Sequence, residues 1–71
     1  MEKMTIVFNK MGNTIDIWFD DPKKEFICEE TGEEIILKKD KKGKIIGLER
    51  LNVLPKRKLE EAELPMEFIV K

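Results

Sequence analysis

The stretch of this chain most suggestive of chemistry is DKKGKIIGLERLN, residues 40–52, in which Asp40 is followed by two lysines and a glycine. Such a segment could be a ligand loop for a metal ion or a phosphate, or a turn between two strands. A calcium loop needs oxygen ligands at alternating positions, and lysines occupy those positions here. A phosphate loop needs more glycines and a following helix, whereas a strand pattern follows Gly43. Asp at the first position and Gly at the fourth are typical of a hairpin turn, so we predict a turn.

Five lysines lie in or beside this predicted turn, and they suggest an alternative function in nucleic-acid binding. A basic hairpin could contact phosphates, but the same charges also discourage edge-to-edge pairing of strands. Proteins that bind single strands place aromatic side chains beside the basic groove, and no aromatic residue lies in this stretch. We therefore favour a solvated loop and keep a nucleic-acid-associated protein as the alternative function. The lysines are Lys38, Lys39, Lys41, Lys42 and Lys44.

The residue types that catalysis near neutral pH requires are scarce. The chain has no His, the side chain best suited to general acid–base work. Asp16 and Asp20 would share one strand face, but four residues of strand separate them by about 13 Å, too far for a close acid–base pair. Metal-ligand spacings, nucleophile motifs and glycine-rich nucleotide loops are absent from the sequence. We expect no enzyme activity and no cofactor, and we name no catalytic, cofactor-binding or metal-binding residue.

Cysteine content and hydropathy bear on location. Cys28 is the single cysteine, so it cannot form a disulfide within the chain, and a reduced, cytoplasmic setting is expected. Neighbouring glutamates would raise its pKa, which predicts an unreactive thiol. No stretch approaches the roughly 20 apolar residues of a membrane span, and the first residues, MEKMTIVFNK, have too short an apolar run for a signal peptide.

Composition indicates one small domain with nearly balanced charge. The chain has 71 residues, of which 41% are charged, and its net charge is −1. This balance disfavours a dedicated nucleic-acid binder, which normally carries a basic excess. The 41% hydrophobic content is enough to support a fold. The charged residues are mostly Lys and Glu, and Gln and Ser are absent, a composition typical of hyperthermophile proteins, so we expect a thermophilic source.

Alternating apolar residues predict two β-hairpins and one further strand. Residues 4–9 and 14–20 alternate on either side of a break at Gly12. A second hairpin is predicted from residues 33–40 and 44–52, and residues 25–30 are expected to form a short edge strand. We predict the α+β class: an antiparallel β-meander of four or five strands with a short C-terminal helix or extension.

The C-terminal part is expected to differ from the rest. We divide the chain into a β-meander domain, residues 1–54, and a helix with a tail, residues 55–71. A short helix is predicted between Pro55 and Pro65, but its charges oppose the helix dipole. It therefore needs contacts with the sheet or with a partner subunit. The apolar tail MEFIV would be sticky if exposed, so it should dock as well.

Apolar residues fall on both faces of the predicted sheet, which predicts that both faces are covered. We expect the C-terminal segment to cover one face and a second subunit to bury the other, in a homodimer. Trp18 is either covered by its own C-terminal segment or anchors an interface. The predicted function is that of a small protein-interaction module that binds another protein. Its candidate contact residues are Trp18, Leu59, Phe68 and Ile69.

The two predicted hairpins together resemble the DUF2283 family, small prokaryotic domains without an established function; the second hairpin carries the most specific match. The matching positions are Asp40, Gly43, Gly47, Glu49, Leu51 and Asn52. The resemblance covers roughly residues 4–53; Arg50 stands where an apolar residue is usual, and Asn9, Met11 and Asn13 stand where acids or turn formers are frequent. It implies a compact β-rich domain with no known cofactor. Similar short chains are sometimes encoded next to small toxin-like proteins, which extends the expectation to an antitoxin-like role.

Overall fold

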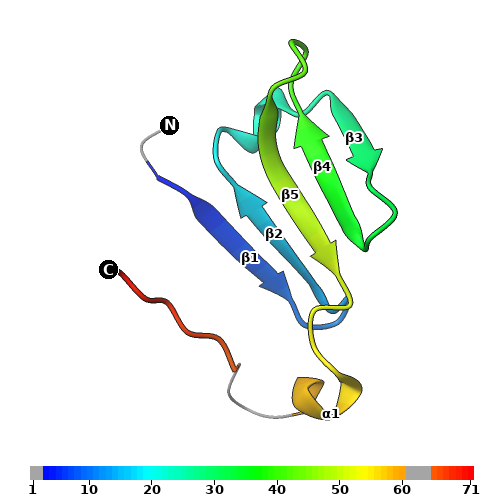
Figure 1. Ribbon diagram of the computed structural model, residues 1–71, viewed down its shortest axis with the longest axis vertical. Coiled ribbons are helices and arrows are strands. Elements are labelled where there is room, and N and C mark those ends of the chain that lie inside the picture. Colours follow the sequence, from blue (N-terminus) through cyan, green and yellow to red (C-terminus); the bar gives the residue numbers. More distant parts are fainter. Residues whose placement is uncertain (1–2, 61–64) are drawn as a thin grey trace.

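The fold is a single antiparallel sheet with very little helix. The computed structural model describes residues 3–60 and 65–71. Its five strands are arranged in the order β1-β2-β5-β4-β3, and a short helix lies beyond one end of the sheet (Figure 1). In the described part of the chain, no helix is long and apolar enough to cross a membrane. The elements are β1 (Thr5–Asn9), β2 (Thr14–Trp18), the 3₁₀ turn η1 (Pro22–Lys24), β3 (Ile27–Glu30), β4 (Ile35–Lys39), β5 (Ile45–Leu51) and α1 (Lys56–Leu59).

Both predicted hairpins and the predicted edge strand are present. In the first hairpin, β1 pairs with β2 and Ile6 stands opposite Ile17; in the second, β4 pairs with β5 and Leu37 stands opposite Leu48. Strand β5 also pairs with β2, so it lies at the centre of the sheet. The expected simple meander is therefore wrong in its connections, because the chain crosses from β2 to the far edge and returns to the middle.

The predicted turn at Asp40 is confirmed. The Asp40 carboxylate accepts hydrogen bonds from the backbone N–H groups of Lys42, at 2.9 Å, and Lys44, at 3.0 Å. The Asp40 carbonyl accepts from Gly43 N–H at 3.0 Å, and Gly43 has a φ of 81°, which glycine adopts without strain. The carboxylate is occupied in closing the β4–β5 hairpin.

The connection from β2 to β3 is anchored on the central strand. Phe19 N–H donates to the Ile46 carbonyl at 2.8 Å, and η1 contacts β5. The β4–β5 register shifts between Lys38 and Lys39, next to this point. Ile46 is the one apolar side chain fully buried in the described part of the chain, at 0% exposure. The single chain therefore has almost no core of its own.

Asn13 fixes the path of the chain as it leaves β5. Its side-chain amide donates to the Leu54 carbonyl at 2.8 Å, and its side-chain oxygen accepts from Leu54 N–H at 3.0 Å. Its backbone carbonyl accepts from Val53 N–H at 3.2 Å. Asn13 has a φ of 54°, a left-handed conformation in which Asn is enriched. These bonds tie the β1–β2 turn to the segment that leads to α1.

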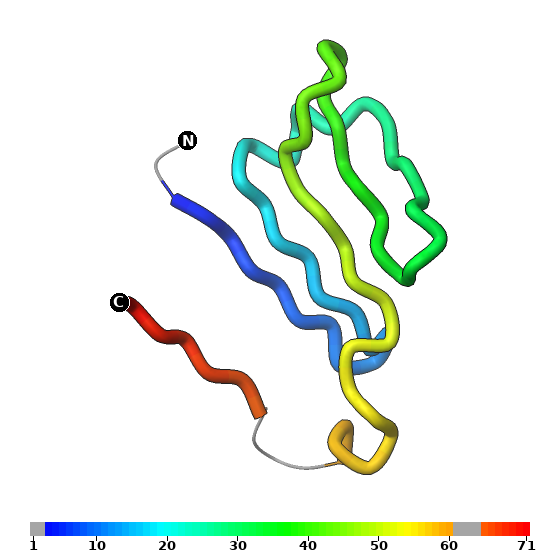
Figure 2. The backbone as a smooth tube through the Cα atoms, viewed as in Figure 1, coloured from blue at the N-terminus to red at the C-terminus, as the bar shows by residue number. Residues whose placement is uncertain are grey.

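The C-terminal part does not lie on its own sheet. Of the helix predicted between Pro55 and Pro65, α1 accounts for four residues, while residues 61–64, including Ala62, lie outside the described residues. Residues 65–71 follow an extended path to one side of the sheet (Figure 2). The expected covering of one sheet face by this segment is therefore not seen in the described residues. Docking on a partner subunit stays a prediction.

Candidate functional site

One face of the sheet is apolar across four strands. Residues opposite each other on neighbouring strands point to the same face, and the register aligns Ile6, Ile17, Leu48 and Leu37 in one row. We call this surface the apolar face. None of its members is fully buried, and α1 lies beyond the sheet rather than over it (Figure 1). The apolar face consists of Ile6, Phe8, Ile15, Ile17, Ile35, Leu37 and Leu48.

Arg50 places a cation on the apolar face. Arg50 stands opposite Ile15 on one side and Ile35 on the other. Its guanidinium lies 3.8 Å from the Glu34 carboxylate, and both side chains are about half exposed. The aliphatic stem of an Arg can lie on apolar surface while its charge stays in water. Arg50 can therefore replace the usual apolar residue without burying an unpaired charge.

Trp18 lies on the opposite face, which we call the polar face. The register places Gly47 between Trp18 and Lys38. A Cβ atom at Gly47 would lie 2.8 Å from Trp18 Cε3, so the indole lies directly against the glycine. The Lys38 Nζ is 5.2 Å from the ring centroid, a cation–π distance. Trp18 is half-buried, and its described cover comes from Lys38 rather than from the C-terminal segment.

Lys38 also joins the sheet to the connection between β2 and β3, residues 19–26, which we call the crossover. Its ammonium donates to Glu25 at 3.1 Å, and Cys28 Sγ donates to the same carboxylate oxygen at 3.4 Å. The hydrogen bond from Lys38 lowers the pKa of Glu25. Burial pulls the pKa of Lys38 down, but the bond and charge of Glu25 outweigh it and raise that pKa. Cys28 lies on an exposed edge strand. Partial burial of its thiol is the larger cause that raises its pKa, and the hydrogen bond and charge of Glu25 raise it further. A raised pKa is expected for an unreactive thiol.

Two carboxylates stand opposite each other at the centre of the polar face. Asp16 pairs in register with Glu49. One carboxylate oxygen of Asp16 is buried and has no hydrogen-bond partner among the described residues. Groups of three His, Cys, Asp or Glu side chains placed to hold a metal ion do not occur among these residues either.

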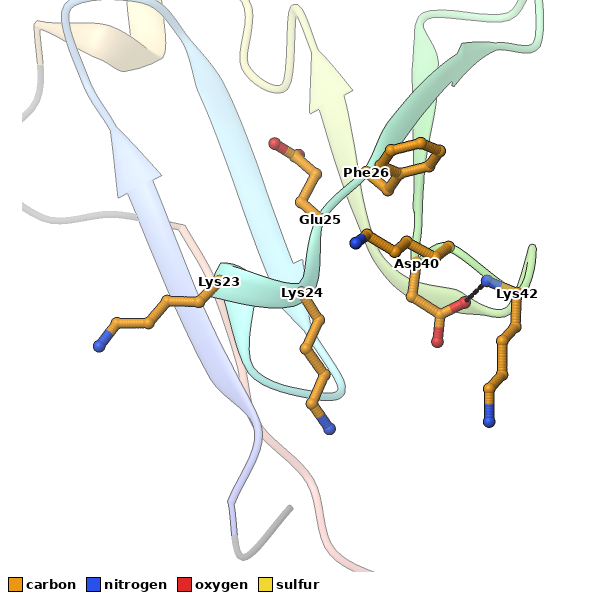
Figure 3. A pocket seen from close by; sticks show the side chains of 7 residues that line it. Lys23, Lys24, Glu25, Phe26, Asp40 and Lys42 are labelled. Atoms are coloured by element: carbon orange, nitrogen blue, oxygen red, sulfur yellow. Dashed lines mark hydrogen bonds between the residues drawn. The ribbon is translucent and has the colours of Figure 1, made fainter.

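A basic groove lies between the crossover and the β4–β5 turn. It has a volume of about 440 Å³. In Figure 3, the side chains of Lys24, Asp40 and Lys42 extend to the same side of the groove, and Phe26 lies across from Lys24. The groove is lined by Lys23, Lys24, Glu25, Phe26, Asp40, Lys41 and Lys42.

The groove contains an aromatic side chain that sequence reasoning missed. The Lys41 Nζ lies 5.9 Å from the centroid of the Phe26 ring. Phe26 is 59% exposed and belongs to the crossover, well before the lysine-rich turn in sequence. The absence of an aromatic from residues 38–44 was therefore a poor guide, because the fold supplies one from another segment. The available signal was positional: Phe26 directly follows the charged segment DDPKKE.

The five lysines proposed for nucleic-acid contact do not act alike. Lys38 and Lys39 belong to β4 and are ion-paired, with Glu25 and Glu29 respectively. Lys41 and Lys42 line the basic groove, and Lys44 is exposed at the end of the turn. The structure therefore leaves the turn lysines as the ones presented to solvent.

The four candidate protein-contact residues do not gather on one surface. Trp18 ends β2 on the polar face, whereas Leu59 is half-buried in α1, at the opposite end of that strand (Figure 1). Phe68 and Ile69 are 85% and 63% exposed in the C-terminal segment. The apolar face itself was marked in the sequence by the alternation of Ile6 and Phe8, but its members were not named as contacts.

Comparison with known proteins identifies a family. No curated protein and no solved structure gives a significant match to the chain. Residues 6–53 match the family described as "Protein of unknown function (DUF2283)". This match runs from the second residue of β1 to just beyond β5, so it spans nearly the whole sheet and ends next to Leu54, to which the Asn13 side chain is hydrogen-bonded. The chain belongs to the DUF2283 family.

Proposed function

We propose that this chain is a protein-interaction module that packs its apolar face against another protein subunit, and that this subunit is a second copy of the same chain. The observation that carries the proposal is the uncovered apolar face itself. An antiparallel sheet normally packs one face on a core. Here the face most suited to such packing has no described element over it.

The surface area agrees with a missing partner. The chain exposes 5956 Å², whereas a compact monomer of 8.4 kDa would expose about 4,600 Å². The excess, roughly 1,300 Å², falls in the range that each subunit of an obligate homodimer buries, about 1,000 to 2,500 Å². The radius of gyration, 13.5 Å, likewise exceeds the roughly 11 Å expected for 71 residues.

The charge distribution supports self-association as well. A net charge of −1 means that two copies do not repel each other strongly. On the apolar face, the charged Arg50 is paired with Glu34 beside it rather than left alone. Polar residues around an apolar centre are the usual anatomy of a protein interface.

Two adjacent residues of β1 provide a matched test. Ile6 and Val7 are 52% and 48% exposed, and they point to the apolar and the polar face respectively. We expect the unaltered protein to have twice the mass of 8.4 kDa by light scattering at micromolar concentration. Ile6→Glu should weaken the dimer at least about 100-fold, because the change counts once per copy and places two carboxylates in an apolar interface. Val7→Glu should leave the mass unchanged.

A folded monomer for the unaltered chain at micromolar concentration would refute self-association through the apolar face. The same face would then be presented to a different protein, and an antitoxin-like role would be one form of that binding. Equal weakening by both variants would also contradict the proposal, because the effect would then not depend on the face. Circular dichroism of each variant shows whether loss of association is accompanied by loss of folding.

A second candidate, binding of single-stranded nucleic acid, is favoured by the basic groove. Its lining combines four lysines with an exposed aromatic ring, the elements that single-strand binders use. The supporting result would be binding that falls steeply with salt and weakens when both Lys41 and Lys42 are changed to Glu. If the double variant binds single-stranded nucleic acid as tightly as the unaltered protein, this candidate function is ruled out. Glu25 and Asp40 in the same lining reduce the positive potential, which is why this function is second.

A further inference from the structure

Strand β1 is an edge strand without the usual protection. It lies at one side of the sheet and, among the described strands, pairs with β2 alone. Its sequence, TIVFN, contains no charged residue and no proline, the features that proteins use to discourage pairing at an edge. The other edge strand, β3, carries Glu29 and Glu30. The backbone of β1 is therefore the more available of the two edges.

Residues 65–71, which we call the arm, have the composition of a strand but no strand partner among the described residues. Its apolar side chains are largely exposed, with Phe68 at 85% and Val70 at 81%. No backbone hydrogen bond joins the arm to the other described residues. Figures 1 and 2 show it extended and separate from the sheet, on the side of β1. Apolar segments exposed in this way are normally covered by a partner.

We propose that the arm of one copy adds to the sheet of a second copy as an antiparallel strand beside β1, reciprocally in the two chains. The choice of a second copy as the partner rests on the proposed dimer. It is also favoured by the position of the arm, which in the single chain lies apart from its own sheet. Every pair of neighbouring strands in this sheet is antiparallel, so an antiparallel addition continues the existing pattern. Addition of a strand to a sheet edge satisfies backbone groups on both sides.

Side-chain pattern and charge select one register. With Phe68 opposite Phe8, the arm places Phe68 and Val70 on the apolar face and Ile69 opposite Val7 on the polar face. A shift by one residue would turn Glu67 onto the apolar face. That shift is disfavoured, because a one-residue slip turns every side chain of the strand to the opposite face of the sheet.

A shift by two residues is disfavoured in either direction. One direction would set Phe68 opposite Ile6 and Lys71 opposite Lys3, and like charges directly opposite are destabilising. The other would set Phe68 opposite Lys10, beyond Asn9, the last residue of β1. The selected register instead places Lys71 opposite Thr5. It also pairs two aromatic rings across the strands, an arrangement that stabilises antiparallel pairs.

Cysteine cross-linking tests both the register and the identity of the partner. The test protein carries Phe8→Cys and Phe68→Cys, with Cys28→Ser to remove the native thiol. Gentle oxidation should give a covalent dimer on a non-reducing gel, because the two new cysteines meet between chains. The control moves the first cysteine to Met11→Cys in the β1–β2 turn, where Met11 is 101% exposed, and should give at least tenfold less dimer.

Two outcomes of the cross-linking experiment would overturn the proposal. A disulfide within one chain would show that the arm returns to its own β1, and equal cross-linking by the control would show non-specific collision. Hydrogen exchange provides an independent readout, since Ile69→Pro should speed exchange of the β1 amides at least tenfold and leave β4 unchanged. A light-scattering dimer without the cross-link and without that change would refute the arm exchange alone, whereas a monomer would refute the dimer itself.

Discussion

Replacement of Gly47 by Ala should destabilise the protein, although the same change in an ordinary strand is stabilising. The new Cβ would lie 2.8 Å from Trp18 Cε3 and 2.9 Å from the Ile17 carbonyl oxygen. Carbon atoms in proper contact are about 3.5 to 4.0 Å apart. The indole can move, but it is held between Gly47 and the Lys38 side chain, and the carbonyl belongs to the central part of the sheet.

The magnitude follows from two opposing contributions. Overpacking of this kind costs about 1 to 3 kcal/mol, while removal of a strand glycine gains about 0.5 to 1 kcal/mol. The midpoints of these two ranges give an expected net loss of about 1.25 kcal/mol, which lowers the melting temperature of a domain this small by about 5 to 10 °C. Trp18 is the single tryptophan, so a shift of its emission to longer wavelength reports displacement of the indole directly.

The matched control is Gly12→Ala, because a Cβ at Gly12 would meet its nearest neighbours at 3.7 Å, an ordinary contact. We expect this variant to melt within about 3 °C of the unaltered protein, since a surface change without a clash alters stability by about 0.5 kcal/mol or less. A Gly47→Ala protein that melts at or above the unaltered temperature, with unshifted emission, would refute the proposed packing of Trp18 on Gly47.

Three further predictions concern the turn and the crossover. Asn13→Ala should cost about 3 kcal/mol by thermal or denaturant unfolding, since two hydrogen bonds are worth about 1 kcal/mol each and Ala is disfavoured at positive φ; Asn13→Gly should cost about 1 kcal/mol less. Because the bond from Lys38 holds the pKa of Glu25 below its usual 4.5, that stabilisation is present above pH 4.5 and is lost as the pH falls through the lowered pKa. Below pH 4.5, the melting temperature of the unaltered protein should therefore fall towards that of the Glu25→Gln variant. If the two melting temperatures differ by the same amount from pH 6 to pH 3, this prediction is wrong. Cys28 should be alkylated several-fold more slowly at pH 7.5 in the native than in the unfolded protein, and Glu25→Gln should speed the native reaction, because the pKa of the thiol is raised by partial burial and by Glu25.

Local features of the fold were predictable from the sequence, and the distant pairings were not. The alternation around Ile6 and Ile17 is a local signal, and it predicted the first hairpin together with its apolar side. The Asp40–Gly43 turn was predictable for the same reason, since both residues act within four positions. The central place of β5 depends on pairing with β2 between residues 29 to 37 positions apart in sequence, and no local pattern encodes that choice.

The candidate sites divide in the same way. Trp18 was recognised as unusual, but its cover could not be foreseen, because Lys38 reaches it only once β5 sets Gly47 between the two strands. Phe26 was overlooked for the same reason, as the crossover brings it beside Lys41. Asn13 was noted as a departure from the usual family residue, and its two bonds to Leu54 explain what Asn can do at that position.

The nearly absent core has a consequence for the level of this protein in a cell. Ile46 is the one fully buried apolar side chain in the described part of the chain. In the proposed dimer, folding of one copy would therefore depend on the copy that covers it, and the folded fraction would rise with concentration. Below the dissociation constant of the dimer, newly made chains would remain open to proteases. Abundance would then follow a threshold: slow synthesis yields almost no protein, and slightly faster synthesis yields a stable pool. Degradation, rather than transcription alone, would set how much of the protein persists.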